Sequence, residues 1–229
     1  SRRTYGLGRL SILAALINAV LLLVAVGAIA LEALQRLSSD STVPHAGTVM
    51  AVAAVGMLVN GATTLLFARG RHGDLNIMAA FQHMAADTLV SLGVVVSGAL
   101  ILISGEAWID PVVSIVIAAL IGWSSWSLLR SSMHLAVDGV PEHVDEQAAD
   151  DHLRSLPGVM DCHDLHIWPL STTRVALTVH LVKPDATIDD AMTHALADEL
   201  EARFKIAHAT IQFEHGNGPV CALKPANVV

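Results

Sequence analysis

The sequence predicts an α-helical membrane bundle of four spans, followed by a small soluble α+β domain with the element order α-β-β-α-β. The 229 residues are 53% hydrophobic and only 15% charged, against about 25% charged residues in an average soluble domain. Residues 1–137 hold 7 Lys or Arg and 6 Asp or Glu, a net charge of +1, whereas residues 138–229 hold 6 and 15, a net charge of −9. The long apolar stretches all lie in the first part. We therefore expect a membrane domain over 1–137 and an acidic domain over 138–229.

Four segments have the length and composition of membrane-spanning helices, because about 20 apolar residues cross a hydrocarbon core of roughly 30 Å. They are residues 10–31, 46–68, 77–103 and 109–129. Pro111 suits the first turn of the last span, since proline lacks the amide hydrogen that a first helical turn leaves unpaired.

Basic residues predict the orientation of the spans, because cytoplasmic loops carry an excess of Lys and Arg. The basic residues that flank the spans on one side are Arg2, Arg3, Arg9, Arg69, Arg71 and Arg130. On the other side only Arg36 occurs. We therefore expect a multi-pass protein of the inner (cytoplasmic) membrane, with both chain ends and the acidic domain in the cytoplasm. In that reducing compartment Cys162 and Cys221 should be free thiols.

The pattern of the sequence changes at the start of the acidic domain. A linker and a helix that ends near Pro157 come first, and then two strand-like runs joined by a short turn. An amphipathic helix that Thr187 can cap is followed by a last short strand and a tail. The predicted strands, the second helix and the last strand cover residues 159–168, 172–182, 187–204 and 209–215.

The first predicted strand contains two histidines, His163 and His166. In a regular strand, successive side chains point to opposite faces of the sheet. Cys162, Asp164, His166 and Trp168 would then share one face, and His163, Leu165 and Ile167 the other. If the strand is regular, the two histidines cannot bind one metal ion together.

His83 and Asp87 stand out in FQHMAADTLVSLGV, residues 81–94, because they are ionisable residues inside the third span. Residues four apart share one face of a helix, so an imidazole nitrogen and a carboxylate oxygen can converge on one point. Both groups are zinc ligands. An ionisable residue in the bilayer costs at least a few kcal/mol, so it usually has a function. The pair predicts half of a metal site; the alternative is that the two side chains only hydrogen-bond each other inside the bundle.

Five segments occur along the chain in a fixed order: YGLGRLSILAALINAVLLL, LNIMAAFQHMAADTLVSLGV, DPVVSIVIAALI, MHLAVDGVP, and HDLHIW with HATIQFE. Together they resemble the cation diffusion facilitator family, and most of all its bacterial zinc, cobalt and cadmium efflux branch. The resemblance implies six spans, of which this chain holds the third to the sixth. It also implies a transport site built from HxxxD or DxxxD on the second span and HxxxD on the fifth, which His83 and Asp87 match.

The chemistry of these ligands and the resemblance imply the same mechanism. Protons and Zn²⁺ compete for one imidazole and one carboxylate, because metal binding needs the deprotonated ligands. A site that opens alternately to the two sides of the membrane can therefore exchange metal for protons. We expect a proton-coupled exporter of divalent cations, Zn²⁺ above all, with Co²⁺, Cd²⁺ or other divalent metals also compatible with the ligands.

The resemblance further implies that the C-terminal domain is metallochaperone-like, forms a homodimer and binds zinc near the dimer contact. Carried over by position, HDL, TVHLV and TIQFE give His163, His180 and Glu214 as ligands. The residues that match ligands in some members only are His194, His208 and Cys221. The residues expected to be isolated surface histidines are His143, His152 and His215. The charge of −9 is either a solvated surface or a repulsion between two domains that divalent cations relieve.

A second function stays open at this point, namely a membrane-tethered metal-binding or metal-sensing protein whose spans are only an anchor. An anchor needs no His–Asp pair in the bilayer, so the sequence favours transport. An enzyme is not expected, because the sequence contains no phosphate-binding glycine loop, nucleophile elbow or HExxH motif. The acidic soluble half also argues against binding to nucleic acid.

Overall fold

The computed structural model describes residues 2, 4–38, 46–72, 74–184, 190–218 and 221. The chain divides into two compact units. Ser11–Met133 form the membrane unit, and Ser1–Leu10 with His134–Val229 form the soluble unit. The boundary that we predict after residue 137 stays a prediction.

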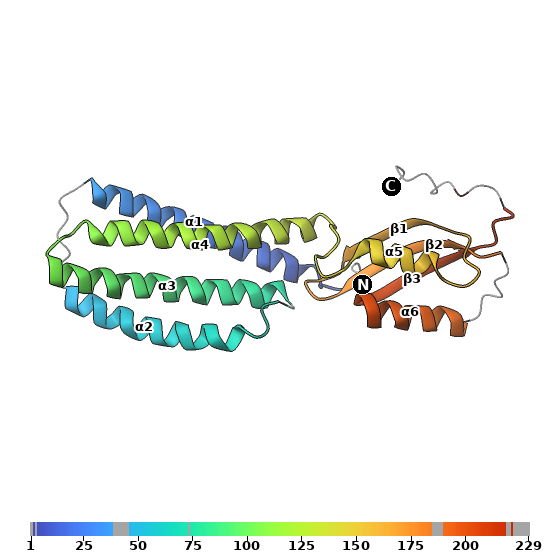
Figure 1. Ribbon diagram of the computed structural model, residues 1–229, viewed down its shortest axis with the longest axis horizontal. Coiled ribbons are helices and arrows are strands. Elements are labelled where there is room, and N and C mark those ends of the chain that lie inside the picture. Colours follow the sequence, from blue (N-terminus) through green and yellow to red (C-terminus); the bar gives the residue numbers. More distant parts are fainter. Residues whose placement is uncertain are drawn as a thin grey trace. The chain divides into compact units, whose positions relative to one another are not determined.

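The membrane unit consists of four long helices, as predicted (Figure 1). They are α1 (Leu10–Leu37), α2 (Ala46–Phe67), α3 (Leu75–Ser104) and α4 (Ile109–Ala136). Each is long and apolar enough to cross a membrane. Asp74 caps α3, because its side chain accepts a hydrogen bond from the amide of Asn76. Helices α1 and α4 continue six and seven residues beyond the apolar segments that predict them, into more polar sequence.

Small residues allow these helices to approach one another closely. Ala19 of α1, Ala79 of α3 and Leu128 of α4 form one buried cluster. At Gly93 of α3 an added Cβ would lie 2.2 Å from Cδ1 of Ile117, so a larger residue there would displace α4 or its side chain. The missing side chain of Gly93 thus leaves room on α3 for Ile117 of α4.

One polar contact joins three of the membrane helices. Asp110, in the first turn of α4, accepts a hydrogen bond of 2.7 Å from the hydroxyl of Ser97 on α3. Its other carboxylate oxygen lies 3.1 Å from Nη1 of Arg36 on α1. The carboxylate is therefore paired, and its side chain is only 17% exposed.

The soluble unit has the predicted order α-β-β-α-β (Figure 1). Its elements are α5 (Glu146–Arg154), β1 (Asp161–Pro169), β2 (Val175–Val182), α6 (Asp190–Phe204) and β3 (Ile206–Glu214). The sheet order is β1-β2-β3, with β1 antiparallel and β3 parallel to β2. Strand β3 begins three residues before the predicted start. Thr187, the predicted cap, lies outside the described residues.

The core of the soluble unit lies on one face of the sheet. Every second residue of β2 is fully buried there, and this row comprises Val175, Leu177, Val179 and Leu181. It packs in one cluster with Leu153 of α5 and Leu200 of α6. Because alternate residues point to opposite faces, His180 lies on the face away from this core.

The expected regular alternation is wrong in β1. The pairing with β2 runs through His163 opposite His180 and His166 opposite Thr178, so β1 holds one extra residue between these pairs. This is a β-bulge, in which two residues of one strand oppose one of its partner. Asp164 at the bulge has a left-handed φ of 52°, and Cys162 and His163 are both buried although they are consecutive.

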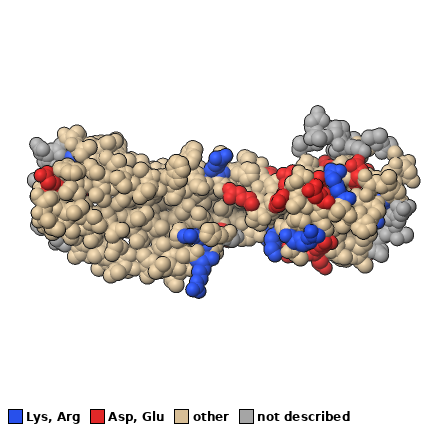
Figure 2. Space-filling view, in the orientation of Figure 1, with Lys and Arg blue, Asp and Glu red and all other residues tan. Residues whose placement is uncertain are grey.

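The two units differ in charge as the sequence predicts. On the face shown in Figure 2, Lys, Arg, Asp and Glu gather over the soluble unit, and the long sides of the membrane helices are almost free of them. An uncharged helix surface suits a lipid environment.

Candidate metal centres

His83 and Asp87 lie on the same face of α3, as their spacing predicts. Nε2 of His83 is 3.7 Å from Oδ2 of Asp87, and the two side chains are 47% and 45% exposed. Within the described residues, neither side chain has another ion-pair or hydrogen-bond partner. The pair is therefore not absorbed into the packing of the described helices, and both groups can offer an atom to a cation.

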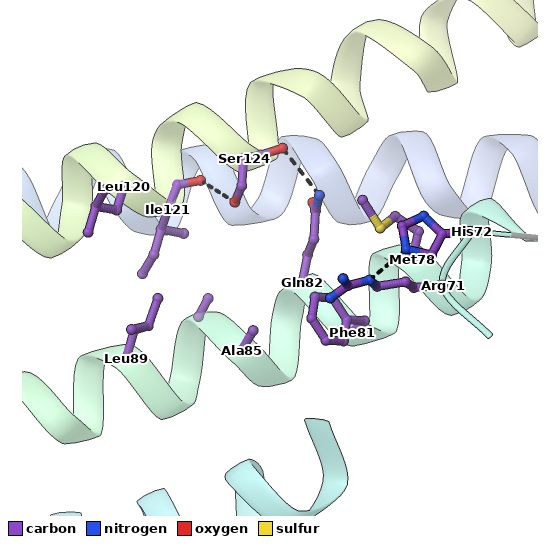
Figure 3. Close-up of a pocket in the computed structure, with 11 residues that line it drawn as sticks. Arg71, His72, Met78, Phe81, Gln82, Ala85, Leu89, Leu120, Ile121 and Ser124 are labelled. Atoms are coloured by element: carbon purple, nitrogen blue, oxygen red, sulfur yellow. Dashed lines mark hydrogen bonds between the residues drawn. The ribbon is translucent and has the colours of Figure 1, made fainter. Parts of the chain in front are cut away.

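A cavity of about 390 Å³ lies between α3 and α4, and neither His83 nor Asp87 lines it. Figure 3 shows Gln82 projecting from α3 toward α4, where its Nε2 donates to the main-chain oxygen of Ser124 over 3.3 Å. Gln82 is 7% exposed, and its Oε1 has no partner among the described residues. This buried amide is not among the functional residues that the sequence predicts. The signal for it is a polar residue next to His83 in a span without Lys or Arg.

A second group of metal-binding side chains lies in the soluble unit. His163, His180, Glu214 and Cys221 each offer one ligand atom, and the four atoms lie within 4.8 Å of one another. The sheet brings them together: His163 and His180 face each other across β1 and β2, and Glu214 ends β3 opposite Val182. Three strands and the segment after β3 thus contribute one ligand each.

Three of the six distances between ligand atoms in this cluster are close to those of a tetrahedral zinc site. Nδ1 of His180 lies 3.1 Å from Oε1 of Glu214 and 3.6 Å from Sγ of Cys221. Nε2 of His163 lies 3.6 Å from the same glutamate oxygen. Zinc–nitrogen bonds of about 2.0–2.1 Å and zinc–sulfur bonds of about 2.3 Å place tetrahedral ligand atoms roughly 3.3–3.7 Å apart. The donor set of two imidazoles, a carboxylate and a thiol therefore fits Zn²⁺.

Burial gives this cluster a second property of a ligand site. The side chains of His163 and His180 are 6% and 12% exposed. Neither ring nitrogen of His163 has a hydrogen-bond partner among the described residues. A buried polar atom without a partner costs about 1–3 kcal/mol, and a bound cation would remove part of that cost.

The other two predicted ligands of the soluble unit lie apart from this cluster. His194 is exposed on α6. His208 is exposed on β3 and makes an edge-on ring contact with Tyr5, with centroids 5.6 Å apart. It precedes Gln212, the neighbour of His180 in the sheet, by four residues, or about 13 Å along a strand. The described structure does not bring either histidine to the four-residue cluster, so their role as ligands stays a prediction.

His152 is not the isolated surface histidine that we expected. Its side chain is only 9% exposed, and its Nε2 lies 3.3 Å from Oε1 of Glu199 on α6. Its Nδ1 is 3.0 Å from Nη1 of Arg203, and its ring packs against Phe204. His152 therefore links α5 to α6, whereas His143 and His215 are exposed.

Comparison with known proteins identifies the family. Residues 1–135 match the cation efflux transmembrane domain, and residues 141–216 match the cytoplasmic domain of the cation efflux protein. The chain belongs to this family, the cation diffusion facilitators. This cation efflux protein is thus a multi-pass transporter of the inner membrane with its C-terminal domain in the cytoplasm, and not an enzyme.

Several relatives of this cation efflux protein have curated names. The metal cation efflux system protein CzcD of Cupriavidus metallidurans is 34% identical over 93% of this chain and 67% of its own length. The cadmium, cobalt and zinc/H(+)-K(+) antiporter of Bacillus subtilis is 32% identical over 97% of this chain and 74% of its own length. The zinc transporter ZitB of Escherichia coli is 32% identical over 97% and 72%.

The two cysteines of this cation efflux protein differ sharply in environment. Cys162 is 2% exposed, and burial away from water raises the pKa of its thiol to about 12, with nearby Asp150 adding to the shift. Cys221 is half-buried in the metal-ligand cluster. Because the thiolate is the reactive form, Cys162 should be inert at neutral pH.

We expect an alkylating reagent at pH 7.5 to modify Cys221 and to leave Cys162 unmodified in the folded protein. Added zinc should slow the modification of Cys221, because a metal-bound thiolate is shielded from the reagent. Mass spectrometry of the labelled peptides measures both rates, and labelling of the unfolded protein controls for intrinsic reactivity. Equal labelling of Cys221 with zinc and with a chelator would contradict a role for Cys221 as a ligand.

Proposed function

We propose that the protein exports divalent cations, Zn²⁺ above all, in exchange for protons. The observation that carries this proposal is the half-exposed pair of His83 and Asp87 on one face of α3, in a part of the chain that holds no Lys or Arg from Asn76 to Leu129. Two ionisable groups in a span cost free energy, and a helix that only anchors a domain does not need them. The names of the relatives, which include a zinc transporter and a cadmium, cobalt and zinc/H(+)-K(+) antiporter, support the same substrate class.

The exchange follows from the two ligand types. A cation arriving from the cytoplasm binds the neutral imidazole of His83 and the carboxylate of Asp87. When the site faces the more acidic side, protons bind these groups and the cation leaves. Histidine suits this role because its ordinary pKa of about 6.5 lies near physiological pH. The proton gradient then drives the metal outward.

We further propose that His163, His180, Glu214 and Cys221 hold a resident zinc ion in the cytoplasmic domain of a homodimer. Their compatible distances support this site, and so do the buried ring nitrogens of His163, which have no hydrogen-bond partner among the described residues. Such an ion supplies positive charge to a domain with a net charge of −9 and joins ligands from all three strands. These residues would hold the resident ion, whereas the transported cations would pass through the membrane unit.

The transport proposal is tested with the full-length protein reconstituted into vesicles that contain a zinc-sensitive dye. With an outward-directed proton gradient, we expect rapid zinc uptake into vesicles, a slower or smaller signal for Co²⁺ and Cd²⁺, and almost none for Mg²⁺ or Ca²⁺. The reason is that imidazole with carboxylate favours zinc-like metals over hard cations. Collapsing the pH gradient with a protonophore controls for coupling.

A zinc flux that is the same with and without the gradient would contradict proton exchange. The complete absence of metal flux, together with tight zinc binding by the soluble unit, would favour the alternative of a membrane-tethered sensor.

A further inference from the structure

The two ring nitrogens of His180 point to different partners. Nδ1 points to the ligand cluster, 3.1 Å from Oε1 of Glu214, whereas Nε2 lies 3.5 Å from Oδ2 of Asp164. A neutral histidine that binds a metal through one nitrogen carries its proton on the other, and that proton is usually given to a carboxylate, a carbonyl or water. The structure offers a carboxylate at this place.

We propose that Asp164 is a positioning residue for the cytoplasmic metal site. Its carboxylate accepts the Nε2 proton of His180 and so keeps Nδ1 free to bind the ion. Nothing in the spacing of the sequence or in the ligand set assigns this role to Asp164. The inference rests on the proposed zinc site, which it deepens.

The β-bulge in β1 is what brings Asp164 to His180. His163 already faces His180 across the two strands, so in a regular strand the next residue, Asp164, would point to the opposite face of the sheet. The extra residue of the bulge removes this alternation, and both side chains contact the same imidazole ring. A bulge re-aims a side chain in this way in many proteins, often beside a functional site.

The backbone conformation of Asp164 is energetically unfavourable, and a local function would explain why it is kept. Its φ of 52° is left-handed, and a residue with a side chain pays on the order of 1–3 kcal/mol to stay in such a conformation. Aspartate and asparagine tolerate it better than most residues. The side chain is only 11% exposed, so the carboxylate is desolvated in part and needs its partners.

His166 completes the arrangement from the outer side. Its Nε2 lies 3.0 Å from Oδ1 of Asp164, the oxygen that does not face His180. One oxygen of the carboxylate thus faces His180 and the other faces His166. Neither carboxylate oxygen belongs to the four-atom cluster. This division distinguishes a residue that orients a ligand from a ligand itself.

Two substitutions separate the carboxylate from the backbone conformation. Asp164→Gly keeps the left-handed backbone without strain and removes the acceptor, and Asp164→Asn keeps both the backbone and an acceptor oxygen. Asp151→Asn, at an exposed carboxylate of α5 that accepts from Gln147, is the matched control. All variants carry His83→Ala in the full-length protein, so that the measured zinc belongs to the soluble unit.

Competition with a zinc chelator measures the affinity. We expect Asp164→Gly to weaken zinc binding about 10–100-fold, Asp164→Asn to weaken it by much less, and Asp151→Asn to leave it unchanged. The absorption spectrum of the Co²⁺-loaded Asn variant should keep the tetrahedral bands of the parent protein. If Asp164 only stabilised the fold, its variants would lose stability, but the loss of zinc affinity would not be larger in Asp164→Gly than in Asp164→Asn.

Unchanged affinity in Asp164→Gly overturns the proposal. Equal losses in the Gly and Asn variants, with an altered Co²⁺ spectrum, also overturn it, because Asp164 would then be a direct ligand. The His180→Ala variant separates failure of the proposed zinc site from failure of the proposed role of Asp164. If this variant binds zinc as tightly as its parent, the zinc site itself is refuted.

Discussion

Replacing His83 by alanine is expected to abolish zinc transport while leaving the protein folded and inserted. The side chain is 47% exposed and has no partner among the described residues except Asp87, so its removal leaves no packing defect. Loss of an outer-shell partner typically weakens a metal site about 10–100-fold, and loss of a direct ligand should exceed that range. Zinc flux in reconstituted vesicles measures the effect.

The control for this variant is Ser91→Ala, which changes a polar residue of the same helix outside the HxxxD motif. We expect its flux to stay within about twofold of the parent protein, since Ser91 is half-buried and contributes no ligand to the proposed pair. Asp87→Asn should resemble His83→Ala, because the amide is a poor metal ligand of nearly the same shape. A His83→Ala variant that transports zinc at the parent rate would refute the membrane site.

Replacing Leu177 by alanine is expected to destabilise the soluble unit by about 2–5 kcal/mol. Leu177 is completely buried in the core between the sheet and its two helices, so truncation leaves a cavity as well as a loss of apolar burial. Alkylation of Cys162 provides the measurement, because this thiol lies in the same core and is reached only when the core opens. With Cys221→Ser as background, labelling should accelerate roughly 30-fold or more, since 1.4 kcal/mol corresponds to a factor of ten.

Met160→Ala is the matched control for the core. Met160 is another large apolar residue of the soluble unit, but it is 77% exposed. Its truncation should change the opening free energy by no more than about 0.5 kcal/mol. If the two variants label Cys162 at the same rate, the core described above does not control the stability of this unit.

The elements that depend on local sequence could be predicted well. Long runs without charge define the four membrane helices, and the alternating apolar residues of β2 define its buried face. The structure begins β3 three residues before the predicted start, for an identifiable reason. Helix α6 ends at Phe204 and β3 begins at Ile206, and the reversal between them uses Lys205 at a φ of 62° instead of the glycine or proline that marks most turns.

The two candidate sites differ in how far the sequence could predict them. His83 and Asp87 lie one helical turn apart, so their proximity follows from helix geometry alone. The ligands of the soluble unit come from three strands, and their proximity depends on sheet register, which only the resemblance to a family indicated. Asp164 could not be predicted to face His180, because HDLHIW contains no glycine to signal a bulge.

The parallel pairing of β3 with β2 has a consequence for the life of the newly made chain. Parallel neighbours require a crossover, here α6, so β3 can pair with β2 only after the whole segment through Glu214 has been synthesised. Until then the nascent domain offers His163 and His180 but lacks Glu214 and Cys221, which arrive last from the ribosome. An ion held by all four side chains would therefore require the chain through Cys221, and shorter nascent chains should bind zinc more weakly.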